Sequence, residues 1–118
     1  MNRRLEKVNE LLQQTLSKLI QAEIKKERNI FVTVQEVKTA SNLKTAKVWI
    51  SLFGKDLKDS EKDEIIQELQ NKTAKFQHQI ATTIDLKFTP KLTFKLDTSA
   101  EILQKIDELV EKSKKNHN

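Results

Sequence analysis

The chain contains a single proline, Pro90, which limits the secondary structure on both sides of it. Proline has no backbone N–H to donate and pushes the preceding residue toward extended geometry, so a helix arriving from upstream has to end there. Apolar and polar side chains then alternate over residues 92–96, as in a strand with one buried face. Thr98 and Glu101 follow at the spacing of a capping box, which satisfies free amides at a helix start. The segment 89–101 therefore predicts a helix end, a strand and a new helix.

Upstream, the apolar residues follow first a helical period and then a strand period. Over residues 3–26, Leu, Val and Ile recur at helical spacing between charged and polar residues, which predicts a long amphipathic helix. Residues 30–37 and 43–53 are rich in β-branched and aromatic side chains, and a short Thr-Ala-Ser-Asn turn joins them. We expect an antiparallel hairpin. One face of its second strand should meet the helices, and that face carries Ala46, Val48, Ile50 and Leu52.

A second helical period starts after a polar loop and continues to about residue 83. Ser60 and Asp63 resemble a capping pair that opens this helix. The middle of the pattern has no strong apolar anchor, so we expect a bend near residues 71–74.

A last amphipathic pattern covers residues 102–110, and the lysine- and asparagine-rich end, residues 113–118, is expected to be disordered. No internal repeat or linker divides the rest, so residues 1–112 are predicted to form one domain. The elements follow the order helix, strand, strand, helix, bend, helix, strand, helix. This order predicts an α+β fold with helices packed on one face of a three-stranded sheet.

Composition and charge narrow the classes of function. The chain has 22 basic and 17 acidic residues, and its formal net charge of +5 favours an anionic partner such as a nucleic acid. Most of the cations are lysines, which suit phosphate better than base edges. The chain has no cysteine, which excludes thiol catalysis and cysteine-ligated zinc. No apolar run is long enough to span a membrane, so we expect a cytoplasmic protein with no membrane partner.

Several stretches of the sequence resemble the ribosome-binding factor A family, a family of bacterial small-subunit assembly factors. Pro90–Lys91–Leu92–Thr93–Phe94, Asp97 and Ser99 are similar to the family's P-x-L-x-F-x-x-D-x-S signature. The other matching residues are Arg4, Val8, Val37, Ser41–Asn42–Leu43 and Ala46–Lys47–Val48. The resemblance covers nearly the whole chain.

The resemblance implies a type II KH-like fold without catalytic activity. It also implies binding to the immature 30S subunit, contact with 16S rRNA, and help in late maturation near the rRNA 5′ end, including at low temperature. We expect a monomer that needs no cofactor and no small-molecule substrate. The sequence departs from the family at the bend, where Lys72–Thr73–Ala74 replace a usual Ala-x-Gly and the glycine that permits a sharp turn is missing. Asn42 replaces a more common Asp, and it can still cap a turn.

Candidate RNA contacts come from the bend, from the approach to the third strand and from the first helix. KH-like domains usually hold the RNA backbone with a glycine-rich loop between two helices, which this chain lacks. The candidates that could bind phosphate are Lys72, Lys75, His78, Lys87, Arg3, Arg4 and Lys7. An alternative of about equal weight is that those at the bend form only the solvated face of a helix. A further group, Lys25, Lys26 and Arg28, is better explained by stabilisation of the helix C-terminus.

Aromatic and histidine residues suggest further candidates. Trp49 and Phe53 would face away from the helices, where rings could stack on bases. A shifted register, or cover by the last helix, would instead make both of them core residues, and this alternative is favoured. His78 and His117 lack a metal-ligand pattern, and no catalytic motif is present, so neither a metal site nor an enzyme is expected.

A function from another class fits the amphipathic patterns alone. The chain would then be a non-catalytic protein-interaction module whose first or last helix packs on a partner helix, and its charge would be incidental. Nuclease treatment of an extract separates the two hypotheses, because only an RNA-dependent complex would disperse.

Overall fold

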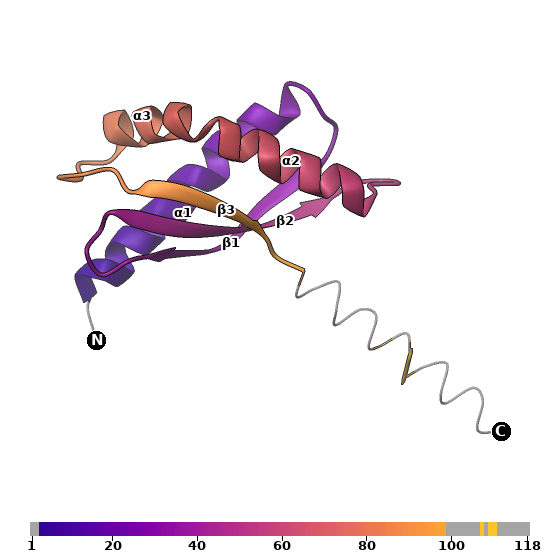
Figure 1. The fold of residues 1–118 in the computed structure, drawn as a ribbon, viewed down its shortest axis with the longest axis horizontal. Helices are drawn as coiled ribbons and strands as arrows, with labels where there is room; N and C mark the ends of the chain where they lie inside the picture. Colours follow the sequence, from indigo (N-terminus) through magenta and orange to yellow (C-terminus); the bar gives the residue numbers. More distant parts are fainter. Residues whose placement is uncertain (1–2, 99–106, 108, 111–118) are drawn as a thin grey trace.

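The computed structural model describes residues 3–98, 107, 109 and 110 (Figure 1). Its elements are α1 (Arg3–Lys25), β1 (Phe31–Thr39), β2 (Thr45–Phe53), α2 (Asp59–Asn71), α3 (Thr73–Thr83) and β3 (Lys91–Leu96). The predicted first helix, hairpin and third strand are confirmed. Each of these elements begins and ends within two residues of the expected position.

The three strands form one mixed sheet in the order β1-β2-β3. β1 and β2 are antiparallel, as predicted, whereas β2 and β3 are parallel. A parallel pair needs a crossover connection, which α2 and α3 supply. Because Lys91 pairs with Thr45, the start of β3 lies beside the β1–β2 turn.

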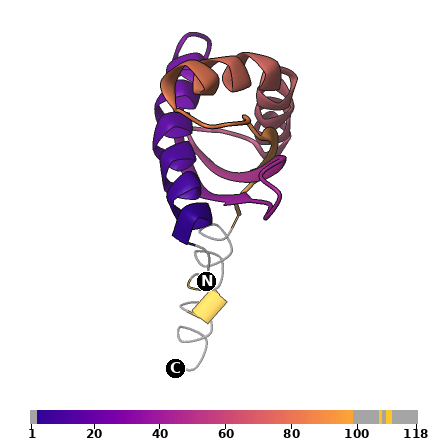
Figure 2. The same ribbon diagram turned by 90° about the vertical axis from the view of Figure 1, so that its left-hand side faces the viewer.

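The three helices cover one face of the sheet, as predicted (Figures 1 and 2). α1 packs on β1 and touches α3, while α2 and α3 pack on β3. The rings of Phe76 and Phe94 meet edge to face, with centroids 5.8 Å apart. The core also contains Leu12, Leu16, Ile20, Val48, Ile50, Ile80 and Leu92, each fully buried.

A break at Lys72 separates α2 from α3, which confirms the predicted bend. Lys72 has φ −98° and ψ 13°, so the break does not use the left-handed conformation that would favour glycine. The hydroxyl of Thr73 donates to the carbonyl of Gln70 at 2.6 Å. The Gln70 amide donates to the carbonyl of Leu92, and its oxygen accepts from the amide of Phe94. The end of α2 is thereby fixed to β3.

The start of α2 differs from the prediction. The helix begins at Asp59 after Lys58, and no side chain caps it, so the predicted capping role of Ser60 is wrong. Leu57, two residues before the helix, is partly buried against the core. The acidic residues Asp59 and Glu61 lie in the first turn, where their negative charges interact favourably with the positive end of the helix dipole.

The predicted last helix falls mostly outside the described residues. Asp107, Leu109 and Val110 are helical. Glu101 of the predicted capping box and the predicted tail at residues 113–118 also lie outside the described residues.

The outer face of the sheet carries the aromatic residues that the alternation placed there. Ala46, Val48, Ile50 and Leu52 are buried toward the helices, as predicted. On the other face Phe53 is exposed and pairs with the exposed Phe31. The favoured prediction, that Phe53 is a core residue, is therefore wrong. Trp49 is half-buried on this face, with Lys38 Nζ 5.8 Å from its ring centroid.

Candidate nucleic-acid interface

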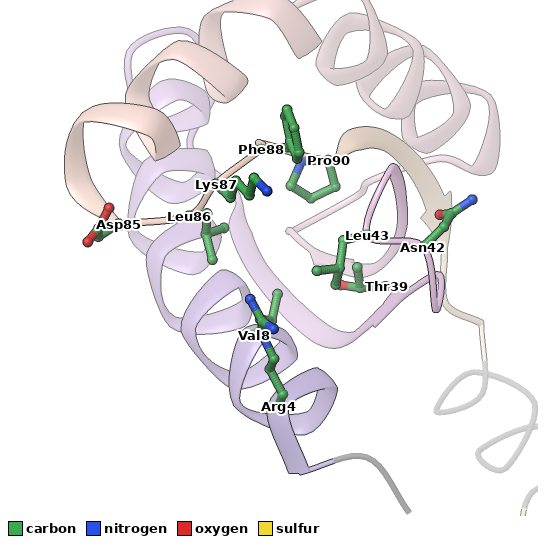
Figure 3. Close-up of a pocket in the computed structure, with 10 residues that line it drawn as sticks. All are labelled: Arg4, Val8, Thr39, Asn42, Leu43, Asp85, Leu86, Lys87, Phe88 and Pro90. Carbon is green, nitrogen blue, oxygen red and sulfur yellow. The ribbon is translucent and has the colours of Figure 1, made fainter.

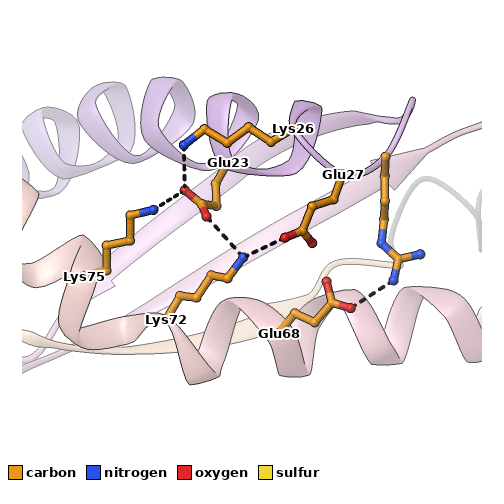
Figure 4. Close-up of polar contacts among 7 residues, drawn as sticks. Glu23, Lys26, Glu27, Glu68, Lys72 and Lys75 are labelled. Atoms are coloured by element: carbon orange, nitrogen blue, oxygen red, sulfur yellow. Dashed lines mark hydrogen bonds and ion pairs between the residues drawn. The ribbon is translucent and has the colours of Figure 1, made fainter.

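The predicted basic contacts occupy two separate regions of the structure. Lys72 and Lys75 lie at the α2–α3 break, beside the C-terminal half of α1 (Figure 4). Arg4 and Lys87 lie at the other end of α3, where they line one pocket (Figure 3). We call the first region the break cluster and the second the end pocket. His78 is exposed on α3 and belongs to neither.

The break cluster is organised around Glu23 of α1, whose side chain is 11% exposed. Lys75 Nζ lies 2.7 Å from one carboxylate oxygen, and Lys72 Nζ lies 3.1 Å from the other (Figure 4). Glu27 lies 3.6 Å from Lys72 Nζ, and Lys26 lies 3.8 Å from Glu23. Lys72 and Lys75, both predicted to contact RNA, are therefore paired with carboxylates of the protein itself.

The electrostatics of the break cluster favour the charged forms on both sides. The hydrogen bond from Lys75 is the largest cause that lowers the pKa of Glu23, which falls from 4.5 to about 2 although burial opposes the shift. The hydrogen bond to Glu23 raises the pKa of Lys72. A separate ion pair, 2.9 Å between Arg28 and Glu68, joins the segment after α1 to α2. This pair gives Arg28 a role beyond the expected one at the helix end.

The end pocket has a volume of about 280 Å³ and forms where three segments meet. These are the N-terminal part of α1, the β1–β2 turn and the loop between α3 and β3 (Figure 3). Apolar side chains line much of it: Val8, Leu43, Leu86 and Pro90. Its polar lining consists of Arg4, Thr39, Asn42, Asp85 and Lys87, and Phe88 completes it.

Local hydrogen bonds fix the turn that borders the end pocket. Leu43 has φ 62°, and its amide donates to the carbonyl of Ala40 at 2.8 Å. Asn42 Oδ1 accepts from the amide of Lys44 at 3.0 Å, so Asn42 caps the turn as expected. The carbonyl of Lys44 accepts from the amide of Lys91, which holds the turn against β3.

The cations at this end lack the carboxylate partners found in the break cluster. Arg3, Arg4, Lys7 and Lys87 are all exposed, and none forms an ion pair with another residue in the described part of the chain. In Figure 3 the guanidinium of Arg4 points from α1 toward the loop that carries Lys87. The structure thus brings together two predicted contacts that are 83 positions apart.

Sequence reasoning missed Phe88, although its side chain is 68% exposed at the end pocket. Lys87 Nζ lies 5.7 Å from the centroid of its ring. The available signal was an aromatic residue beside a lysine, two positions before the only proline. Five residues that carry the family resemblance also line the pocket: Arg4, Val8, Asn42, Leu43 and Pro90.

Two further features are absent from the described residues. No group of three or more His, Cys, Asp or Glu side chains among them could hold a metal ion. Their helices also include none that is long and apolar enough to cross a membrane.

Comparison with known proteins gives one family. The family model for ribosome-binding factor A matches residues 4–110. The ribosome-binding factor A of Clostridium beijerinckii is 33% identical over 110 residues, which covers 92% of each chain.

Structural comparison shows the same fold in members of this family. The crystal structure of ribosome-binding factor A from Thermus thermophilus has a TM-score of 0.64 at 16% identity and covers 78% of this chain and 94% of that one. A homology model of the Thermus thermophilus protein, fitted into a cryo-EM map of a 30S complex, has a TM-score of 0.54 at 16% identity, covering 75% and 93%. These likenesses confirm the KH-like α+β fold. The extent of the family match shows that this chain belongs to the ribosome-binding factor A family.

Proposed function

We propose that this protein is an RNA-binding assembly factor that docks on the small ribosomal subunit and holds 16S rRNA through phosphate contacts. The observation that carries the proposal is the pair of exposed cations that line the end pocket, Arg4 and Lys87, with exposed Arg3 and Lys7 on the same N-terminal part of α1. Counterion release makes such a group a binding surface for a polyanion. The relative fitted into a 30S map supports the choice of the small subunit.

Membership of the family supports a more specific role. We propose that the protein associates with the immature 30S subunit in the cytoplasm and acts as a monomer without catalysing a reaction. It would assist late maturation and processing at the 5′ end of 16S rRNA, including at low temperature.

The proposed contacts are not equivalent. Lys72 and Lys75 would leave Glu23 to reach an RNA phosphate, and that side chain is nearly buried and carries a strongly lowered pKa. We therefore assign these two lysines mainly to joining α1 to the α2–α3 break. His78 is free to add a contact from the exposed side of α3.

The alternative function, a protein-interaction module, loses one of its two candidate helices. The apolar side of α1 packs on the sheet, where Val8, Leu12, Leu16, Ile20 and Ile24 are buried. Leu11 is the large apolar side chain of α1 that is exposed, at 44%. A single such residue is ordinary for a soluble surface.

Co-sedimentation with purified 30S subunits tests the proposal directly. We expect the logarithm of the affinity to fall linearly with the logarithm of the salt concentration, because bound cations displace counterions from RNA. In an extract, nuclease treatment should disperse the complex. Association that resists both salt and nuclease would instead favour the protein-interaction module.

A further inference from the structure

We propose that the end pocket binds one unstacked nucleotide of single-stranded RNA. Its base would lie against Phe88 and its phosphate between Arg4 and Lys87. The inference rests on the proposed function. The proposed surface recognises phosphate, and the end pocket would add a site that holds a base.

The size and lining of the pocket suit one nucleotide. Its volume of about 280 Å³ is just below the range for small-molecule sites, roughly 300–1,000 Å³, as expected of a site for a single small group. Apolar side chains from three segments face the space, including Val8 of α1, Leu43 of the turn and Pro90 before β3. The apolar faces of a flat base can pack in such a space with its polar edge toward polar side chains, whereas the charged sugar-phosphate backbone has to stay at the rim.

The charges at the pocket suit one phosphodiester group. Arg4 and Lys87 contribute two positive charges and Asp85 one negative charge, so the lining carries a net charge of +1. In Figure 3 Asp85 lies at one side of the pocket, away from Asn42. A carboxylate accepts hydrogen bonds only, so Asp85 would repel phosphate and could accept from a ribose hydroxyl.

Phe88 gives the pocket a surface for stacking. Its ring is 68% exposed, and the ammonium group of Lys87 lies over it at 5.7 Å. Single-stranded nucleic acids bind where aromatic rings stand beside cations, because each base can stack while its phosphate is neutralised. A peptide partner would use the apolar lining as well, but paired cations beside an exposed ring favour a nucleotide.

Two polar groups can read the base. The side chain of Thr39 lines the pocket, and its Oγ1 is buried without a hydrogen-bond partner among the described residues. Asn42 uses its Oδ1 to accept from Lys44, which leaves the side-chain amide to donate. A buried hydroxyl without a partner is costly, so a base edge that reaches it would gain a hydrogen bond that the free protein lacks.

Fluorescence anisotropy with a labelled ten-nucleotide single-stranded RNA of uridines tests the site. We expect Phe88→Ala to weaken binding about fivefold or more, because it removes one base stack. Phe31→Ala is the matched control, since Phe31 is equally exposed at 65% but lies at the far end of the hairpin. It should change binding less than twofold. Both side chains are mostly in solvent, so thermal unfolding should report folded variants in each case.

Parallel co-sedimentation with 30S subunits separates failure of the pocket from failure of the proposed function. If the wild-type protein binds both probes and the Phe88→Ala variant binds them equally well, the nucleotide site in the pocket is overturned and the proposed function is not. A wild-type protein that binds neither probe would overturn both.

Two other outcomes would also overturn the pocket. A larger loss for Phe31→Ala than for Phe88→Ala would place base stacking on the outer face of the sheet. A Phe88→Ala variant weakened toward 30S subunits but not toward the RNA oligonucleotide would mean that the pocket holds a ribosomal protein segment.

Discussion

The break cluster and the end pocket both contain basic residues that the sequence offers as RNA contacts, yet their surroundings differ. At the break, Glu23 lies within 3.1 Å of both Lys72 and Lys75. At the end pocket, Arg4 and Lys87 face a shared space and form no ion pair within the part of the chain that the structure describes.

We infer from the difference that a lysine already paired with a carboxylate of the protein is a weaker candidate for an RNA contact than an unpaired cation is. A phosphate that approaches Lys75 competes with a carboxylate held at 2.7 Å. A phosphate that approaches Arg4 displaces only water and ions, and their release favours binding. On the proposed function, we therefore expect the position of the carboxylates to influence where this chain binds RNA.

The largest expected effect comes from reversing the two charges of each region in turn. We expect the double substitution Arg4→Glu and Lys87→Glu to weaken binding to 30S subunits on the order of tenfold or more, without loss of stability. The substitutions Lys72→Glu and Lys75→Glu should instead lower the free energy of unfolding by about 2 kcal/mol, because they leave Glu23 beside like charges.

These two double variants control for each other. Each reverses two unit charges, so each takes the net charge from +5 to +1 and alters long-range attraction to RNA equally. Co-sedimentation and urea unfolding then separate local contacts from global charge. Equal losses of binding in the two variants would contradict the distinction between the regions.

A smaller effect is expected when the carboxylate at the centre of the break cluster is removed. Glu23→Gln keeps the shape of the side chain but leaves Lys72 and Lys75 without their shared anion, which should cost about 1–2 kcal/mol in urea unfolding. Glu10→Gln is the control, because Glu10 is exposed on the same helix and has no ion-pair partner in the described residues. If Glu23→Gln binds 30S subunits several-fold more tightly than Glu10→Gln does, the freed lysines contact RNA and the two regions are more alike than proposed.

The same pair of proteins should show a pH-dependent difference in stability. The pKa of Glu23 is about 2 in the folded protein, below its ordinary value of 4.5, so its contribution is present above pH 4.5 and is lost as the pH falls toward 2. The gap in unfolding free energy between wild type and Glu23→Gln should therefore be constant from pH 7 to about pH 5 and shrink below that. A gap that stayed unchanged at pH 3 would mean that the ion pairs do not stabilise the fold.

The sequence predicted the elements because their signals are local. The apolar period of α1 and the alternation of β2 each arise from side chains a few positions apart. The predicted cap of α2 is wrong, because a spacing in the sequence does not show whether the side chain reaches a free amide.

The candidate site could be predicted only in part, because its distinctions depend on contacts between distant segments. Glu23 is 49 and 52 positions from the two lysines that it pairs with, and no periodic pattern links them. Arg4 and Lys87 were both proposed, but the shared pocket needed the crossover that brings β3 beside the β1–β2 turn. Phe88 lies in a loop, where an aromatic residue has no period to mark its role.

The smallest expected effect concerns the hydroxyl of Thr39 at the end pocket. Thr39→Val removes a buried oxygen that has no hydrogen-bond partner in the described structure, and it keeps the branched shape that suits a strand. We expect the free energy of unfolding to rise by about 0.5–1 kcal/mol and RNA binding to weaken by about twofold to fivefold. Thr33→Val, in the same strand on the outer face of the sheet, should change neither quantity by as much. If the hydroxyl serves a ligand and not the fold, its removal should raise stability and weaken binding. A loss of stability in Thr39→Val would mean that the hydroxyl serves the fold, and the contrast with the break cluster would then rest on Arg4 and Lys87 alone.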